Sequence, residues 1–271
     1  MKNKNLISSL VFTISILFVS TAANATVVEV RTSVGNFQVN LFDNATPRTV
    51  ENFLLYVNAG TYARNTVHRS DDNFVIQMGG FQYNNSFPAD AITTNPPVIN
   101  EPELSNIRGT VAMAKLGNQP NSATSQFFVN LSDNTLSPYF LDQQNGGFTV
   151  FGQVIGNGME IVDQIASLPT FPFATPFGQL PLTGYTSADF TNNVTPTDSN
   201  LVVIFDIVVI DAAVSTNPNL NPAVNTLINS DDGPQQPIDD GGSGGSLGIM
   251  MMLGLAVLVA MRRRVFSQFK N

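Results

Sequence analysis

The sequence contains no cysteine, no tryptophan and a single histidine, His68, among its 271 residues. Without cysteine, disulfide bonds, thiolate metal sites and Cys-His nucleophile pairs are excluded. A single histidine excludes a multi-histidine zinc site, and a Ser-His-Asp triad would depend on His68 without any nucleophile elbow in the sequence. We therefore interpret His68 as a packed structural residue. The stability of the fold must come from side-chain packing.

Basic residues are scarce between the two ends of the chain. Of the 12 lysines and arginines, two are Lys2 and Lys4 and four lie within 262–270, which leaves six beside all 20 acidic residues, a net charge of −14. Nucleic-acid binding depends on basic side chains that neutralise phosphates, so a nucleic-acid partner is not expected. Glycine-rich stretches also lack the lysine and the strand-to-helix setting of a phosphate-binding loop.

The N-terminal end predicts export from the cytoplasm. Lys2 and Lys4 precede a mostly apolar run from Leu6 to Val19, and the small residues Ala23-Asn24-Ala25 follow it. This order is typical of a cleaved secretory signal peptide, here residues 1–25. The apolar run is short for an uncleaved transmembrane anchor.

The C-terminal end predicts a contact with a membrane. Residues 212–246 are polar and end in a glycine-rich run, as in a flexible linker. Residues 247–261 form a short, uncharged transmembrane segment, and the basic tail 262–271 should stay on the cytoplasmic side. Two interpretations stay open: a retained anchor, and a sequence that resembles a GlyGly-type sorting signal, cut by an intramembrane protease. Both place domain 26–211 in the periplasm or at the cell surface.

Domain 26–211 has the pattern of a mostly β protein. Apolar and polar residues alternate on both sides of Gly35-Asn36, which predicts a hairpin. Helical spacing predicts two helices, over 46–60 and 159–166. Further strands are expected at five apolar segments, which are 74–78, 109–114, 126–131, 148–155 and 201–210. Between 168 and 200 the chain has five prolines and little periodicity, so it is predicted to be either a long loop or an elaborated connection, with no role assigned.

Three ordered blocks of this domain resemble the cyclophilin family of peptidyl-prolyl cis-trans isomerases. They comprise Asn52-Phe53, His68-Arg69 and Phe74–Gly80, then Arg108–Ala114 and Ser122–Val129, then Phe140–Asp142 and Val150–Val154. The resemblance implies a closed, antiparallel, eight-stranded β-barrel with two capping α-helices. It also implies an enzyme that accelerates rotation about X-Pro bonds in proline-containing polypeptides and needs no cofactor or metal.

The resemblance assigns a candidate site. Arg69 matches the catalytic arginine, whose guanidinium would donate a hydrogen bond toward the prolyl nitrogen as the bond twists. An apolar pocket of Phe74, Met113, Phe128 and Leu141 would hold the proline ring. Phe140 and Phe148 stand where the family has a tryptophan and often a histidine. The residues expected to bind substrate are Phe74, Val75, Gln77, Met113, Ala114, Lys115, Gln126, Phe128, Phe140, Leu141 and Phe148.

One segment departs from the family pattern. Ser70-Asp71-Asp72-Asn73 stands where apolar residues, proline and glycine are usual, and an aspartate there can engage Arg69 and weaken catalysis. Asn73 can adopt the left-handed conformation that glycine would supply. Two hypotheses follow: an isomerase that assists the folding of exported proteins, and a proline-peptide binding module or holdase chaperone on the same fold. The presence of Arg69 with Gln77 and Phe128 favours the enzyme.

Overall fold

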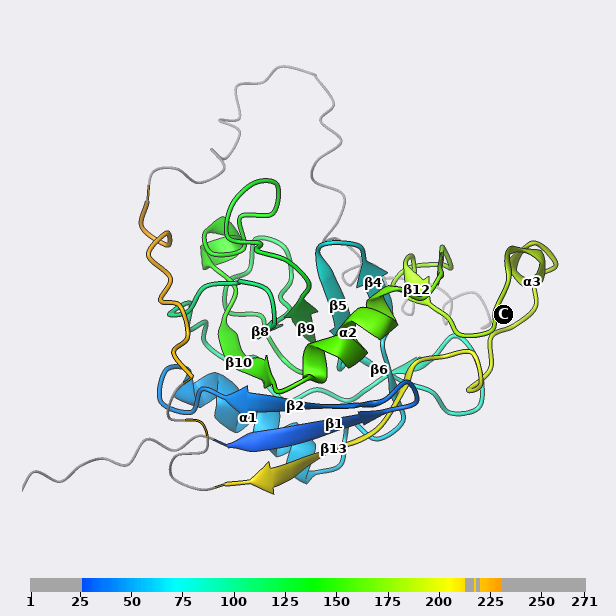
Figure 1. Ribbon diagram of the computed structural model, residues 1–271, viewed down its shortest axis with the longest axis horizontal. Helices are drawn as coiled ribbons and strands as arrows, with labels where there is room; N and C mark the ends of the chain where they lie inside the picture. The colour runs from blue at the N-terminus through cyan, green and yellow to red at the C-terminus, as the bar shows by residue number, and fades with distance from the viewer. Residues whose placement is uncertain (1–25, 213–216, 218–219, 231–271) are drawn as a thin grey trace, which may run out of the picture.

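The computed structural model describes residues 26–212, 217 and 220–230 (Figure 1). The segments predicted as signal peptide, membrane segment and basic tail lie outside these residues. Within the described part of the chain, no helix combines the length and the apolar character needed to cross a membrane. The principal elements are β1 (Val27–Thr32), β2 (Asn36–Leu41), α1 (Pro47–Asn58), β3 (Asn65–Thr66), β4 (Arg69–Asp71), β5 (Val75–Met78), β6 (Phe81–Gln82), β7 (Asp90–Ala91), β8 (Thr110–Met113), β9 (Phe127–Asn130), the 3-10 helix Gln144–Gly146, β10 (Val150–Ile155), α2 (Gly158–Ala166), β11 (Thr170–Phe171), β12 (Leu180–Pro181), α3 (Ser187–Thr191) and β13 (Val203–Asp211).

The main sheet has eleven antiparallel strands in the order β4-β5-β9-β8-β10-β2-β1-β13-β3-β6-β7. The predicted mostly β class is confirmed. The predicted closed, eight-stranded barrel is wrong, because the sheet curls into a half-barrel whose end strands, β4 and β7, are not paired to each other. These end strands have only three and two residues, so neither presents a long ladder for closure.

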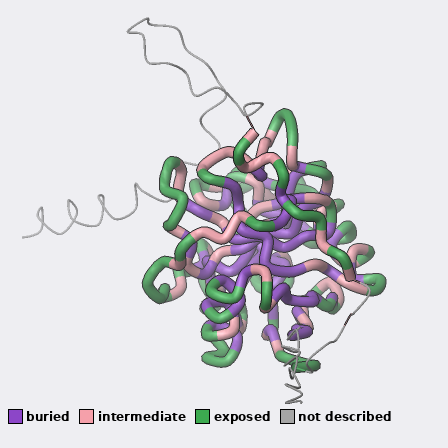
Figure 2. Tube along the Cα trace, turned by 90° about the vertical axis from the view of Figure 1, so that its left-hand side faces the viewer, coloured by how far each residue is buried: buried purple, intermediate pink, exposed green. Residues whose placement is uncertain are grey.

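Alternation in the sequence decides which side chains enter the core. In the hairpin of β1 and β2, Val28 and Val30 are buried, and so are Phe37 and Val39, as the period-two pattern requires. The main core also takes the aromatic residue Phe53 from α1, whose ring lies 5.0 Å from that of Phe151 and 5.4 Å from that of Phe127. Figure 2 shows the buried part of the trace concentrated in the middle of the molecule.

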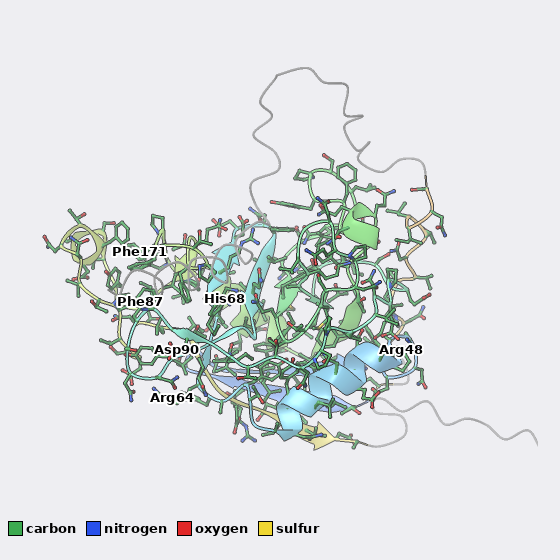
Figure 3. The ribbon with its side chains drawn as sticks, turned by 180° about the vertical axis from the view of Figure 1, so that it is seen from behind. Arg48, Arg64, His68, Phe87, Asp90 and Phe171 are labelled. Atoms are coloured by element: carbon green, nitrogen blue, oxygen red, sulfur yellow. The ribbon has the colours of Figure 1, made fainter. Side chains whose placement is uncertain are left out.

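Both predicted helices are present. Pro47 occupies the first turn of α1, where its missing N–H costs nothing, and the buried face of the helix includes Val50 and Phe53. In α2, Val162 and Ile165 are buried. Figure 1 shows α2 at the front, and Figure 3, from behind, shows α1 at the front, so the helices cover opposite sides of the curled sheet.

The 168–200 segment is structured rather than a plain loop. It contains the β11–β12 hairpin and α3, which begins with a capping box between Thr186 and Asp189. Its apolar residues form a second core with side chains of β6 and the segment that follows it; Phe87 and Phe171 lie at this end of the molecule in Figure 3. Sequence periodicity missed these elements because each is five residues or shorter.

Residues 220–230 are bound to the domain, although the sequence predicts them as part of a flexible linker. The Ser105 backbone N–H donates to the Ala223 carbonyl at 2.9 Å, and the Asn225 N–H donates to Glu103 at 2.9 Å. The Asn225 amide donates to the carbonyls of Pro102 and Asp142 at 3.1 and 2.9 Å. Asparagine satisfies these buried acceptors, so a polar composition does not make this part of the chain flexible.

Candidate active site

One row of residues across neighbouring strands carries the candidate site. In the register of the sheet, Arg69 on β4 is opposite Gln77 on β5, Gln77 is opposite Phe128 on β9, and Phe128 is opposite Ala112 on β8. Directly opposed residues of antiparallel strands point to the same face. The sheet therefore brings the predicted catalytic arginine, an amide and an apolar side chain to a single face.

An apolar cluster continues this row. Its buried members are Phe42, Phe74, Val75, Leu104, Ala112, Phe128, Leu141, Phe148 and Val150, and Ala114, Tyr139 and Leu220 pack against them. The structure thus brings together most of the apolar residues that the sequence predicts for the site. Met113 and Phe140 are the exceptions. Met113 is fully buried in the main core, because side chains alternate along β8 and Ala112 faces the cluster instead.

Three contacts fix the guanidinium of Arg69. Its Nη2 lies 2.7 Å from Oδ2 of Asp71, and both side chains are 14% exposed. Its Nε donates to Oε1 of Gln179 at 3.0 Å, and its Cζ lies 5.5 Å from the centre of the Phe74 ring. Within the described residues, Nη1 donates no hydrogen bond. The expectation that an aspartate in the segment after Arg69 engages its guanidinium is confirmed, and Asn73 has the left-handed φ of 57°.

The glutamines of the site contact each other rather than the arginine. Nε2 of Gln77 donates to Oε1 of Gln126 at 2.9 Å. The Gln126 side chain lies against Gly80, where an added Cβ would approach it to 2.6 Å. Both glutamines are half-buried, so their remaining polar atoms can still reach a peptide bound at this face.

Tyr139, rather than its neighbour Phe140, packs against the apolar cluster. The Tyr139 ring stacks on Phe74 with centroids 3.7 Å apart, whereas Phe140 lies outside the apolar cluster. Phe140 has a φ of 49°, a conformation unfavourable for a bulky residue, and it turns the chain there. Sequence alone does not show such a turn at a phenylalanine.

Lys115 is buried, and its side chain packs beneath the apolar cluster against Phe148. Its Nζ donates to Oδ1 of Asn100 and to the carbonyls of Asn145 and Gly147, at 3.2, 2.9 and 2.6 Å. It also lies 4.7 Å from the centre of the Phe148 ring. Burial lowers the pKa of Lys115 to about 7. The predicted contact with substrate can therefore come from its backbone but not from its side chain.

His68 is buried beside Arg69 and packs edge-on against Phe81, with ring centroids 4.8 Å apart. Burial, and then the positive charge of Arg69, lower the pKa of His68 to about 3. The imidazole is therefore neutral in the folded protein at neutral pH, which agrees with its interpretation as a structural residue.

This shift predicts an acid-sensitive fold. Below the ordinary histidine pKa of 6.5, the unfolded chain binds a proton at His68 that the folded chain does not. The free energy of unfolding should therefore fall by about 1.4 kcal/mol per pH unit from pH 6.5 toward pH 3. In His68→Phe this component is absent. Urea unfolding at pH 7.0, 5.5 and 4.5 measures it, and a constant difference between the two proteins at all three pH values would contradict the prediction.

Similar proteins identify the class to which this fold and site belong. The family model described as "Cyclophilin type peptidyl-prolyl cis-trans isomerase/CLD" matches residues 27–184. A peptidyl-prolyl cis-trans isomerase of Acinetobacter baylyi is 44% identical over 149 residues, which cover 54% of this chain and 74% of that protein. Peptidyl-prolyl cis-trans isomerase A of Dickeya dadantii is 40% identical over 175 residues, 62% of this chain and 87% of that protein.

A solved structure, of a cyclophilin type peptidyl-prolyl cis-trans isomerase of Cryptosporidium parvum, is 23% identical, with a TM-score of 0.48. It covers 69% of this chain and 98% of that chain. The family match and the bacterial relatives show a peptidyl-prolyl cis-trans isomerase domain. The chain belongs to the cyclophilin-type peptidyl-prolyl cis-trans isomerase family, and it is an enzyme of that type.

Proposed function

We propose that Arg69 is the catalytic residue of this isomerase and that the face formed by Gln77, Gln126 and the apolar cluster binds the X-Pro segment. The observation that carries the proposal is the Arg69 guanidinium, which is held at Nε and Nη2 while Nη1 donates to no described residue. A held donor with free N–H groups, next to buried aromatic side chains, is suited to a neutral and partly apolar substrate.

The required rate enhancement is within reach of such a site. The X-Pro bond resists rotation by about 18–20 kcal/mol because amide resonance must be broken, and the uncatalysed process takes tens to hundreds of seconds. Millisecond turnover requires about five decades, or roughly 7 kcal/mol. As the amide twists, the prolyl nitrogen regains its lone pair, and a hydrogen bond from Arg69 to that nitrogen is stronger in the twisted state than in either planar state.

The rest of the rate enhancement comes from binding, which orients the X-Pro segment relative to Arg69. Phe128, Leu141 and Phe148 are apolar and almost fully buried, so the proline ring contacts them only when the side chains that cover them move aside. Tyr139 covers Phe74, so a proline ring that packs on Phe74 has to displace it. Gln77 and Gln126 can donate to and accept from the peptide units on either side of the bond. No step requires proton transfer, a metal or a cofactor.

The clients we propose are exported proteins, outside the cytoplasm. The signal-like residues 1–25 and the apolar and basic segments 247–261 and 262–271 support this location. Mass spectrometry of the intact protein from its native host tests it. A chain that retains residues 1–25 would overturn export, and the presence or absence of 247–271 separates a retained anchor from a cleaved sorting signal.

The direct test of the function is the cis-to-trans isomerisation of a proline-containing tetrapeptide in the presence of the purified protein. Acceleration that is proportional to enzyme concentration supports catalysis. Saturable peptide binding without acceleration would support the alternative, a proline-peptide binding module or holdase chaperone. The ion pair between Arg69 and Asp71 is the observation that favours this alternative, because the carboxylate competes with substrate for the guanidinium.

The same ion pair makes a prediction for Asp71→Asn. The amide keeps an oxygen acceptor for Nη2 but removes the negative charge that offsets the guanidinium, so more of its positive charge acts on the prolyl nitrogen. We expect kcat/KM to rise about threefold to tenfold, a change of roughly 0.7–1.4 kcal/mol. Asp72→Asn is the matched control, because Asp72 is exposed. Equal rates for both variants would show that Asp71 does not restrain catalysis.

A further inference from the structure

The strand that carries Arg69 lies at one end of the sheet. β4 has three residues and pairs with β5 on one side only. A short edge strand exposes unpaired backbone groups and frays readily. Its side chains would therefore be poorly fixed unless another segment covered the open edge.

The 168–200 segment supplies that cover. Arg69 forms a parallel bridge with Gln179, and the Ser70 backbone N–H donates to the Gln179 carbonyl at 2.8 Å. Figure 1 shows β12, which begins at the next residue, beside β4. Leu180 and Leu182 are fully buried in the second core and anchor this short stretch. The Gln179 backbone thus holds the edge of β4 in place.

The Gln179 side chain reaches the catalytic group itself. Its Oε1 accepts from Nε of Arg69 at 3.0 Å, while Asp71 holds Nη2 at 2.7 Å. A planar guanidinium bound at two of its three nitrogens has its plane and its direction fixed. The third nitrogen, Nη1, donates to no described residue and is left for a substrate acceptor. Asp71 alone would leave the plane free to turn about the single contact at Nη2.

We infer that Gln179 is a positioning residue of the isomerase site, and that it orients the Arg69 guanidinium for the transition state without contacting the substrate. The inference rests on the proposed role of Arg69. It gives the 168–200 segment a function in catalysis. Positioning matters at this level because displacements of about 1 Å at a reacting group can cost up to a hundredfold in rate.

The test uses Gln179→Met in the purified protein, which preserves side-chain length and removes the acceptor. We expect kcat to fall about tenfold with KM within twofold of wild type, since substrate contacts are unchanged. The NMR signal of the Arg69 Nε–H should move and exchange faster with water. Gln179→Glu, which restores an acceptor for Nε, should recover the slow exchange of that signal.

Two comparisons separate positioning from other effects. Gln38→Met is the matched control, because Gln38 is exposed on β2 and the substitution is the same. In an Arg69→Ala background, Gln179→Met should change kcat by less than twofold.

A wild-type kcat in Gln179→Met, while Arg69→Ala is inactive, overturns the positioning role alone. A wild-type kcat in Arg69→Ala overturns the proposed function. A loss caused by Gln179→Met that persists in that background assigns Gln179 a purely structural role and also overturns the inference.

Discussion

Replacement of Arg69 by alanine should lower kcat/KM for a proline-containing tetrapeptide by about 100- to 1,000-fold. A preorganised donor aimed at the charge of a transition state contributes roughly 2.7–4 kcal/mol when it is tested by removal. Arg69 fits this description because Gln179 and Asp71 hold its guanidinium from two sides. Coupled isomerisation assays or NMR exchange spectroscopy would measure the loss.

Arg69→Lys should lose nearly as much activity as Arg69→Ala. An ammonium keeps the charge but has no planar fork, so it cannot contact Gln179 and Asp71 and still present a third fixed donor. Recovery of more than a third of the wild-type rate by lysine would show that positive charge, rather than geometry, carries catalysis.

A control arginine separates catalysis from general effects of charge. Arg48 is exposed on α1, and Figure 3 shows it far from His68, the neighbour of Arg69. Arg48→Ala should retain wild-type kcat/KM. The Arg69 variants should also unfold in urea with the cooperativity of the wild type, which would show that loss of this largely buried ion pair leaves the fold intact. If Arg69→Ala is unfolded, the activity of Arg69→Lys tests the catalytic role instead.

The placement of Arg69 beside Gln77 was predictable because the two residues are close in the sequence. Arg69 and Gln77 lie on two adjacent strands, where their pairing fixes a common face, and Phe74 lies in the turn between these strands. Phe128 joins them through β9, which pairs with β5. The same rule of alternation places the Met113 side chain in the main core. Applied to 109–114, it would have selected Ala112 and Ala114 instead.

Gln179 was not predictable in this way. It is 110 residues from Arg69, and no periodic pattern links a two-residue strand to β4. The prediction of a closed barrel was wrong for a related reason. Whether a curled sheet closes depends on long-range pairing of its end strands, which the alternation of apolar and polar residues does not encode. The packing of 220–230 against the domain was not predictable either, because the composition of a polar, asparagine-containing segment is that of a flexible linker and does not show its buried hydrogen-bond acceptors.

A buried polar network behind the pocket leads to the second large prediction. Asn106 is fully buried, and its amide donates to Oδ1 of Asp142 and to the carbonyl of Phe148, both at 3.0 Å. Its Oδ1 accepts from Asn130 at 3.3 Å. Asp142 is fully buried too, directly after Leu141 in the pocket wall. The network therefore ties two walls of the apolar cluster to the sheet.

Asn106→Ala should reduce the free energy of unfolding by about 3–4 kcal/mol. Each buried partner left without its hydrogen bond costs roughly 1–3 kcal/mol, and the loss is larger beside a buried carboxylate. For a domain of this size the melting temperature should fall by roughly 6–16 °C. Asn58→Ala, at the exposed end of α1, should change the free energy by no more than about 0.5 kcal/mol. A similar melting temperature in both variants would mean that the Asn106 side chain does not hold the loop bearing Leu141 and Phe148, because the Asn106 backbone N–H, which donates to Oδ1 of Asp142 at 2.7 Å, would then be a sufficient donor.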